Sequence, residues 1–111
     1  MRRIDHTKTP LFTALKEHMN KDVIPFHVPG HKYGRGNQEL LEFFGENTMK
    51  ADVNGMEDLD NACNPISVIK EAEEYVADAF GAEEAFFLVN GTTSGIQAMI
   101  MSAVRPGEQI I

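Results

Sequence analysis

The residues whose types and spacing best suit chemistry form the turn Asn90-Gly91-Thr92-Thr93-Ser94, which follows an apolar run. A helix that begins here leaves its first backbone N–H groups unpaired and carries a partial positive charge at that end. Small residues let an anion approach those groups, and the Thr and Ser hydroxyls add donors. The same residues can also simply cap the helix. The turn alone therefore supports a phosphate site and a helix cap about equally, and it matches neither the P-loop nor the dinucleotide-binding pattern.

A second group of reactive side chains lies in a loop rich in proline and glycine, residues 23–37. His27 and His31 are four residues apart, and Lys32 follows directly. The prolines exclude a regular helix, and no third ligand accompanies the histidines, so no metal site is expected. The histidines are instead expected to line a cleft or to hydrogen-bond the loop backbone. Lys32 is not expected to be a reactive amine, because such a lysine needs a rigid, desolvated site.

The elements that would position these groups begin with a helix and a long loop-rich segment. Thr9 as the cap and Pro10 at the first helical position predict a helix over residues 9–22. Residues 23–63 are predicted to be loop-rich, with a short helix near 39–44. The acidic stretch 45–63 is expected to be irregular, with its carboxylates solvated or bracing the loop.

An α/β core is expected to begin in residues 64–111. Asn64 and Pro65 start the clearest helix pattern, which ends at Gly81 with Glu73 and Glu74 pointing to water. Further along, the pattern predicts a buried strand over 85–89, a helix over 93–104 and the beginning of a strand over 109–111. This alternation is typical of a mostly parallel sheet. Because two strands bury little core, we expect part of a larger fold; a small independent α+β domain is the alternative.

The composition argues against several classes of protein. Acidic residues outnumber basic ones, 17 to 10, and the net charge of −7 disfavours a nucleic-acid surface. The single cysteine, Cys63, permits no disulfide within the chain, which fits a reducing, cytoplasmic setting. No apolar run approaches the roughly 18 residues that span a membrane, and no signal peptide is evident. The sequence predicts a cytoplasmic protein with no nucleic-acid or membrane partner.

Four separated motifs, taken together and in order, resemble the opening of the Orn/Lys/Arg decarboxylase family. They are Pro25–Lys32, Phe43–Thr48, Pro65–Gly81 and Asn90–Ser94. The resemblance runs from about Thr9 to the end of the chain. It implies a pyridoxal-phosphate enzyme with the aspartate-aminotransferase fold (fold type I). Residues 1–111 would then be the N-terminal portion of its major domain.

The resemblance also implies a reaction and a cofactor site. Such enzymes release CO2 from arginine, lysine or ornithine with pyridoxal 5'-phosphate as the electron sink, and their products feed polyamine synthesis. Carried over by motif, Thr92 and Thr93 become ligands of the cofactor phosphate, with Gly91 and Ser94 as weaker assignments. The residues assigned to the substrate or active-site loop are His27, His31 and Lys32.

The family's Schiff-base lysine lies in a Ser-x-His-Lys motif well downstream of the segment that this chain resembles. No catalytic residue is therefore assigned here, and we expect the chain to be inactive alone.

Three interpretations stay open. The first is the N-terminal part of a basic amino-acid decarboxylase, with arginine as the favoured substrate, that is a homo-oligomer at full length. The second is a truncated, non-catalytic relative that binds a full-length decarboxylase. The third is another fold-type I pyridoxal-phosphate enzyme, such as an aminotransferase or aldolase, which the Pro29-Gly30-His31-Lys32 loop disfavours.

Overall fold

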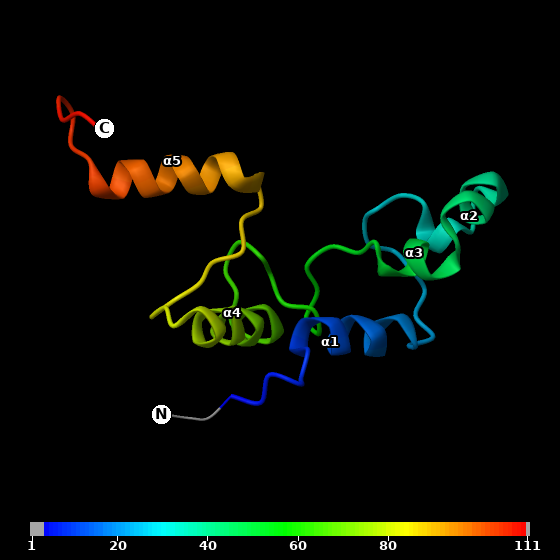
Figure 1. Cartoon of the computed structure of the whole chain (residues 1–111). Helices are drawn as coiled ribbons and strands as arrows, with labels where there is room; N and C mark the ends of the chain where they lie inside the picture. The colour runs from blue at the N-terminus through cyan, green and yellow to red at the C-terminus, as the bar shows by residue number, and fades with distance from the viewer. Residues whose placement is uncertain (1–3, 111) are drawn as a thin grey trace.

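A computed structural model describes residues 4–110 and shows helices joined by long loops (Figure 1). The molecule is elongated, with extents of 55 × 37 × 23 Å. Its elements are α1 (Pro10–Met19), the short 3-10 helix η1 (Lys32–Gly34), α2 (Gln38–Phe44), α3 (Glu46–Ala51), α4 (Val68–Phe80) and α5 (Gly91–Ala103).

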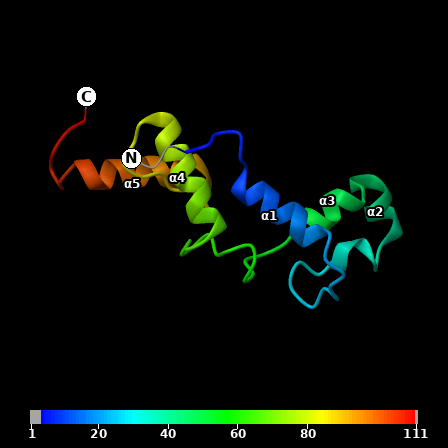
Figure 2. The ribbon, with the colours of Figure 1, turned by 90° about the horizontal axis from the view of Figure 1, so that it is seen from below.

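The first predicted helix is confirmed, with a shorter C-terminal end. Thr9 occupies the N-cap position and Pro10 the first turn, where its missing N–H costs no hydrogen bond. The helix ends at Met19, three residues before the predicted end at 22. Helix α1 packs against both α3 and α4, so it joins the two halves of the molecule (Figure 2).

The segment 23–63 contains more helix than the sequence indicates. Helix α2 forms where a short helix was expected, and the side chain of Asn37 caps it by accepting a hydrogen bond from the Leu40 N–H at 2.9 Å. The expectation of irregular structure from residue 45 is wrong at its start, since α3 begins at Glu46. Gly45 has φ +81 between the two helices, a conformation that favours glycine and lets the chain turn.

Helix α4 ends as predicted but begins later. Gly81 has left-handed backbone angles (φ 66, ψ 28) at its C-cap. The predicted start at Asn64 and Pro65 is wrong, because the helix begins at Val68, and the Asp60 carboxylate supplies the cap from outside the helix. The expectation that Glu73 points to water is also wrong: its side chain is buried, whereas Glu74 is exposed.

Neither predicted strand is formed within residues 4–110. Residues 85–88 and 108–110 have no regular secondary structure, and Ile111 lies outside the described residues. A strand is stable only when a neighbouring strand pairs with its backbone, and the described part of the chain supplies no such neighbour. Phe86 and Val89 are accordingly exposed. The described structure is mostly helical, so it does not display the predicted parallel sheet.

Helix α5 lies apart from the other helices (Figure 1). It contacts none of them within the described residues, and its apolar side chains Ile96, Met99, Ile100 and Met101 are exposed. Within residues 4–110, no helix has the length and apolar character required to cross a membrane.

Candidate functional site

The turn that leads into α5 places backbone donors at a helix end that is open to solvent. Gly91 is the first residue of this 13-residue helix and has φ +71, which favours glycine. Asn90 occupies the N-cap position, but no side chain accepts a cap hydrogen bond there. The side-chain cap that the sequence allowed at the start of α5 is therefore absent from the described residues. The first N–H groups of α5 have no intrahelical acceptor.

The three hydroxyl residues of this turn differ in how far they are already engaged. Ser94 Oγ donates to the Gly91 carbonyl oxygen at 2.8 Å, so its proton is used within the helix. Thr92 and Thr93 are exposed, and neither side chain hydrogen-bonds to another described residue. No acidic residue lies in the first turn to repel an anion. The turn thus offers unpaired backbone N–H groups and two free hydroxyls in consecutive exposed residues, and these groups suit the oxygens of a phosphate group.

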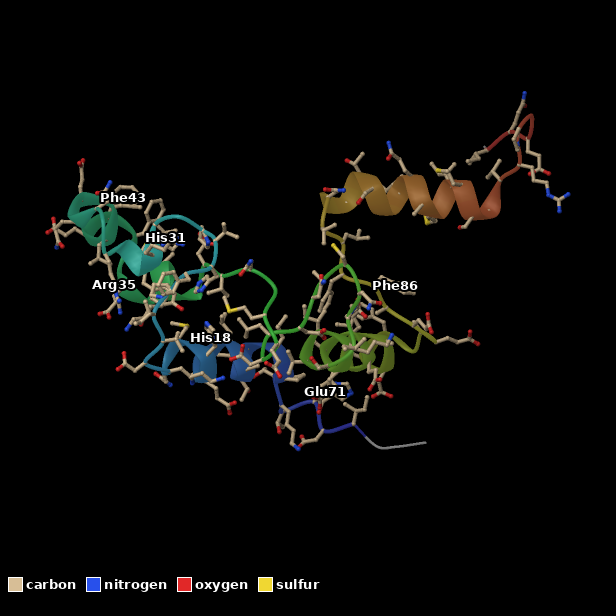
Figure 3. The ribbon with its side chains drawn as sticks, turned by 180° about the vertical axis from the view of Figure 1, so that it is seen from behind. His18, His31, Arg35, Phe43, Glu71 and Phe86 are labelled. Carbon is tan, nitrogen blue, oxygen red and sulfur yellow. The ribbon has the colours of Figure 1, made fainter. Side chains whose placement is uncertain are left out.

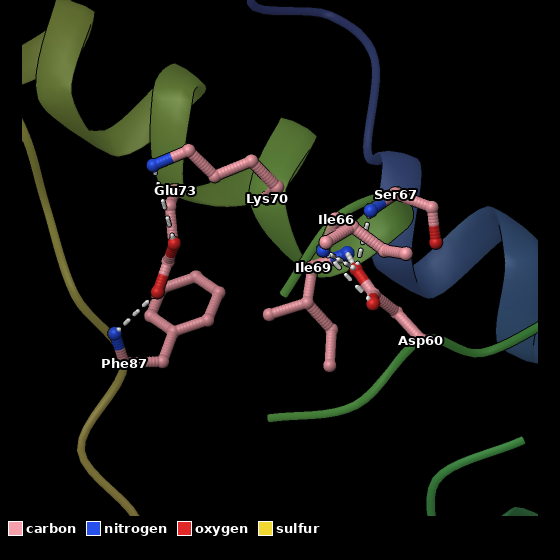
Figure 4. Close-up of polar contacts among 7 residues, drawn as sticks. All are labelled: Asp60, Ile66, Ser67, Ile69, Lys70, Glu73 and Phe87. Atoms are coloured by element: carbon pink, nitrogen blue, oxygen red, sulfur yellow. Dashed lines mark hydrogen bonds and ion pairs between the residues drawn. The ribbon is translucent and has the colours of Figure 1, made fainter. Parts of the chain in front are cut away.

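Two contacts fix the segment that carries this turn. Leu88 lies directly over Gly95, where an added Cβ would stand 2.5 Å from Leu88 Cδ1. The carboxylate of Glu73 on α4 accepts a hydrogen bond from the Phe87 N–H at 2.9 Å (Figure 4). Neither Leu88 nor Glu73 was predicted from the sequence to belong to the site. A signal for Glu73 was its spacing, four residues from both Ile69 and Ala77, which puts it on the apolar face of α4.

The three residues assigned to the active-site loop are all engaged by their surroundings. His31 Nε2 lies 3.2 Å from Asp52 Oδ2, and Lys32 Nζ donates to the His27 carbonyl oxygen. The His27 ring lies against Tyr33, with ring centroids 5.5 Å apart. Burial, and then the nearby positive charge of Lys32, lower the pKa of His27, which favours its neutral form. Lys32 thus braces the loop backbone, a role that the sequence suggested for the histidines and not for this lysine.

His18 is a residue of this region that the sequence analysis missed. It is 4% exposed, its Nδ1 lies 2.9 Å from Asp58 Oδ2, and its Nε2 lies 3.5 Å from the Tyr33 hydroxyl. Lys21 donates to the same Asp58 oxygen at 2.5 Å. The hydrogen bonds from Lys21 and His18 lower the pKa of Asp58 to about 2. The His18–Asp58 contact joins α1 to the acidic stretch 45–63. Through Tyr33, His18 also contacts the loop 23–37 that carries His27 and His31, here called the histidine loop.

Asp60 shows how the acidic stretch braces the chain. Burial raises the pKa of its carboxyl, but hydrogen bonds from the N–H groups of Ile66, Ser67, Asn61 and Ile69 outweigh burial and hold it well below its usual range. Figure 4 shows this carboxylate at the start of α4. Asp60 has φ +69, a conformation that Asp and Asn tolerate better than most residues. The expectation of a loop-bracing carboxylate is confirmed at this position.

The two candidate regions lie at opposite ends of the molecule. Figure 3 shows His31 and Arg35 near one end and α5 near the other. The structure thus brings His27, His31 and Lys32 together with one another but not with Gly91, Thr92, Thr93 and Ser94. Among residues 4–110, no group of three or more His, Cys, Asp or Glu residues is arranged to hold a metal ion.

Comparison with known proteins identifies relatives along the whole chain. The chain is 44% identical to an arginine decarboxylase of Bacillus anthracis over 112 residues, which cover 100% of this chain and 23% of that protein. It is 43% identical to an arginine decarboxylase of Bacillus subtilis (strain 168) over 105 residues, which cover 94% of this chain and 21% of that protein. It is 31% identical to the constitutive lysine decarboxylase of Escherichia coli (strain K12) over 115 residues, which cover 97% of this chain and 16% of that protein.

These matches show that the chain spans about a fifth of the length of its curated relatives. No solved structure matches it. The family model for the Orn/Lys/Arg decarboxylase major domain matches residues 9–111, which hold both the histidine loop and the turn into α5. The chain therefore belongs to the Orn/Lys/Arg decarboxylase family.

Proposed function

We propose that this chain forms the phosphate-holding part of a pyridoxal-phosphate-dependent decarboxylase of basic amino acids. The observation that carries the proposal is the uncapped start of α5, where Thr92 and Thr93 have free hydroxyls beside unpaired backbone N–H groups. A dianionic phosphate would meet both hydrogen-bond donors and the positive end of the helix dipole there. Family membership supports pyridoxal 5'-phosphate as the molecule that carries this phosphate.

The chain's own residues would hold and orient the cofactor. The backbone N–H groups from Gly91 onward and the hydroxyls of Thr92 and Thr93 would bind the phosphate, and Ser94 would serve chiefly to stabilise the first turn. When bound, the pyridine ring would supply an electron sink for the electron pair that stays on the substrate α-carbon as CO2 leaves. A phosphate fixed at a helix end orients that ring relative to the rest of the site.

The substrate part of the proposal is decarboxylation of arginine. The relatives named arginine decarboxylase are 43–44% identical to this chain, whereas the lysine decarboxylase of Escherichia coli is 31% identical. In this proposal, the loop that carries His27, His31 and Lys32 belongs to the active site of the complete, homo-oligomeric and cytoplasmic enzyme. No lysine of this chain is proposed to bond covalently to the cofactor, so the chain alone would not release CO2.

A binding experiment tests the phosphate site directly. The purified chain and a Thr92→Val/Thr93→Val variant would be titrated with pyridoxal 5'-phosphate while the ³¹P NMR signal is followed. We expect the double variant to bind at least about tenfold more weakly, since hydrogen bonds to a charged group contribute roughly 1.5–3 kcal/mol each. Thr48→Val, an exposed threonine on α3, is the matched control. Equal affinity in all three proteins would refute the site.

A second experiment tests the reaction. The chain would be incubated with cofactor and with arginine, lysine or ornithine, and CO2 release would be measured. We expect none above background. In parallel, residues 9–111 would replace the matching segment of the Bacillus anthracis relative, and we expect the chimera to decarboxylate arginine faster than lysine. A chimera that folds, binds the cofactor and lacks this activity would contradict the proposed substrate.

A further inference from the structure

We infer that Glu73 is a positioning residue that sets the phosphate-binding turn at a fixed place relative to α4. The inference rests on the proposed function. It begins from a single contact, in which Glu73 Oε1 accepts a hydrogen bond from the Phe87 N–H at 2.9 Å (Figure 4). Phe87 lies just before the turn, three residues ahead of Asn90.

The burial of this carboxylate is unusual for its position. The Glu73 side chain is 4% exposed, and its Oε2 is buried without a hydrogen-bond partner. Lys70 Nζ lies 3.8 Å from that oxygen, at the limit of an ion pair, and is itself 37% exposed. Burying a charged group with so few partners is unfavourable. Glu74, the next residue, is the same type and stays in water. A specific demand at position 73 therefore explains the burial better than helix stability does.

That demand is the placement of the segment 85–90. Helix α5 contacts no other helix within the described residues, so this segment is what joins the turn to the rest of the molecule. Glu73 holds the segment at Phe87, and the next residue, Leu88, packs over Gly95 in the second turn of α5. The two adjacent contacts connect α4, the segment and the start of α5 in one continuous path.

The path matters because a phosphate site depends on accurate placement of its donors. Binding groups need to be held within about half an ångström of their productive positions by the residues behind them. If the Phe87 contact is lost, the turn at Asn90 and Gly91 would sample several positions relative to α4. The affinity for phosphate should then fall, although no group that touches the phosphate has changed.

The test uses the chain with three substitutions at adjacent glutamates. Glu73→Gln keeps a side-chain oxygen that can accept the Phe87 N–H, Glu73→Ala removes it, and Glu74→Ala is the matched control. For each protein we would measure hydrogen exchange at the Phe87 amide, ¹⁵N relaxation at residues 91–94 and affinity for pyridoxal 5'-phosphate. We expect Glu73→Ala to lose amide protection and bind about tenfold more weakly, with Glu73→Gln within about threefold of the unaltered chain.

The outcomes separate this inference from the proposed function. If Glu73→Ala loses protection at Phe87 but keeps full affinity for the cofactor, the positioning role is refuted and the phosphate site stands. If the unaltered chain binds no pyridoxal 5'-phosphate, the proposed site is refuted instead. The positioning role is then judged by ¹⁵N relaxation alone: unchanged motion at residues 91–94 in Glu73→Ala refutes it, and increased motion there supports it. A helix content equal to that of Glu74→Ala would show that α4 has not unfolded.

Discussion

The two ends of the molecule treat their polar groups in opposite ways. At the end that carries the histidine loop, three side chains each form a hydrogen bond with another group of the chain: His18, His31 and Lys32. At the α5 end, Thr92 and Thr93 are exposed and unbonded within the described residues, and the helix start has no side-chain cap.

This difference distinguishes residues that stabilise the folded chain from residues that are available to bind a ligand. A polar group that already has its partners within the chain contributes to the conformation, and its loss leaves those partners unsatisfied. A group that is positioned but unbonded contributes little to the conformation and is available to a ligand. Substitutions at the first kind of residue should therefore change stability, and substitutions at the second kind should change affinity.

The largest effect on stability is expected for Asp60→Ala. Four backbone N–H groups, those of Asn61, Ile66, Ser67 and Ile69, would lose their acceptor. We expect the unfolding midpoint, followed by circular dichroism, to fall by at least about 5 °C. Asp60→Asn keeps one oxygen and tolerates the positive φ, so its unfolding midpoint should lie between those of the unaltered chain and Asp60→Ala. An Asp60→Ala midpoint equal to that of the control, Glu57→Gln at an exposed carboxylate, would contradict this role.

The next effect is expected on affinity rather than stability. Thr92→Val/Thr93→Val should weaken cofactor binding by about tenfold or more, while the free energy of unfolding changes by less than about 0.5 kcal/mol. Isothermal titration and urea unfolding on the same preparations would measure the two quantities. A large loss of stability in this variant would show that the hydroxyls support the fold, and the contrast between the two ends would then fail.

A smaller, pH-dependent effect is expected at Asp58. Because hydrogen bonds from Lys21 and His18 lower its pKa from 3.8 to about 2, its ionised form stabilises the folded chain above about pH 4. That stabilisation should disappear as the pH falls from about 4 to about 2. Urea unfolding of the chain and of Asp58→Asn should therefore differ by a modest amount at neutral pH and converge in acid. A difference that stays constant over this range would contradict the assignment.

The smallest effect is expected at an exposed ion pair. Glu46 lies 2.6 Å from Lys50 across one turn of α3, and the hydrogen bond from Lys50 lowers the pKa of Glu46. The Glu46 side chain is 67% exposed, so water and salt screen this pair. Glu46→Gln should leave both the thermal midpoint and the cofactor affinity unchanged. A lower thermal midpoint or a weaker cofactor affinity in Glu46→Gln would contradict this expectation. It would show that the Glu46–Lys50 pair contributes to folding or binding despite its exposure.

Local signals predicted helix ends well where the residues that mark the end adjoin the helix in sequence. Thr9-Pro10 marked the start of α1, and Gly81 marked the end of α4. The start of α4 was placed too early because its cap comes from Asp60, which lies seven residues before the N-cap Ser67. The strand expected over 85–89 depends on a pairing partner, which a run of apolar residues cannot reveal.

The candidate site shows the same division. The turn 90–94 was predicted because its possible phosphate-binding groups belong to consecutive residues. Glu73 was misplaced because its charge predicts exposure, although its spacing, four residues from both Ile69 and Ala77, puts it on the apolar face of α4. The later segment that carries Phe87 then contacts its carboxylate. His18 was missed because its partners, Asp58 and Tyr33, are distant in sequence.

The close approach of Leu88 to Gly95 has an evolutionary consequence. Since a Cβ at position 95 would stand 2.5 Å from Leu88 Cδ1, the two positions share one volume. Relatives that carry alanine or serine at position 95 should carry a smaller or differently branched residue at position 88. An alignment of the family should therefore show these two columns changing together, and a lineage that enlarges position 95 alone should show the half-exposed residue 88 side chain turned away from α5.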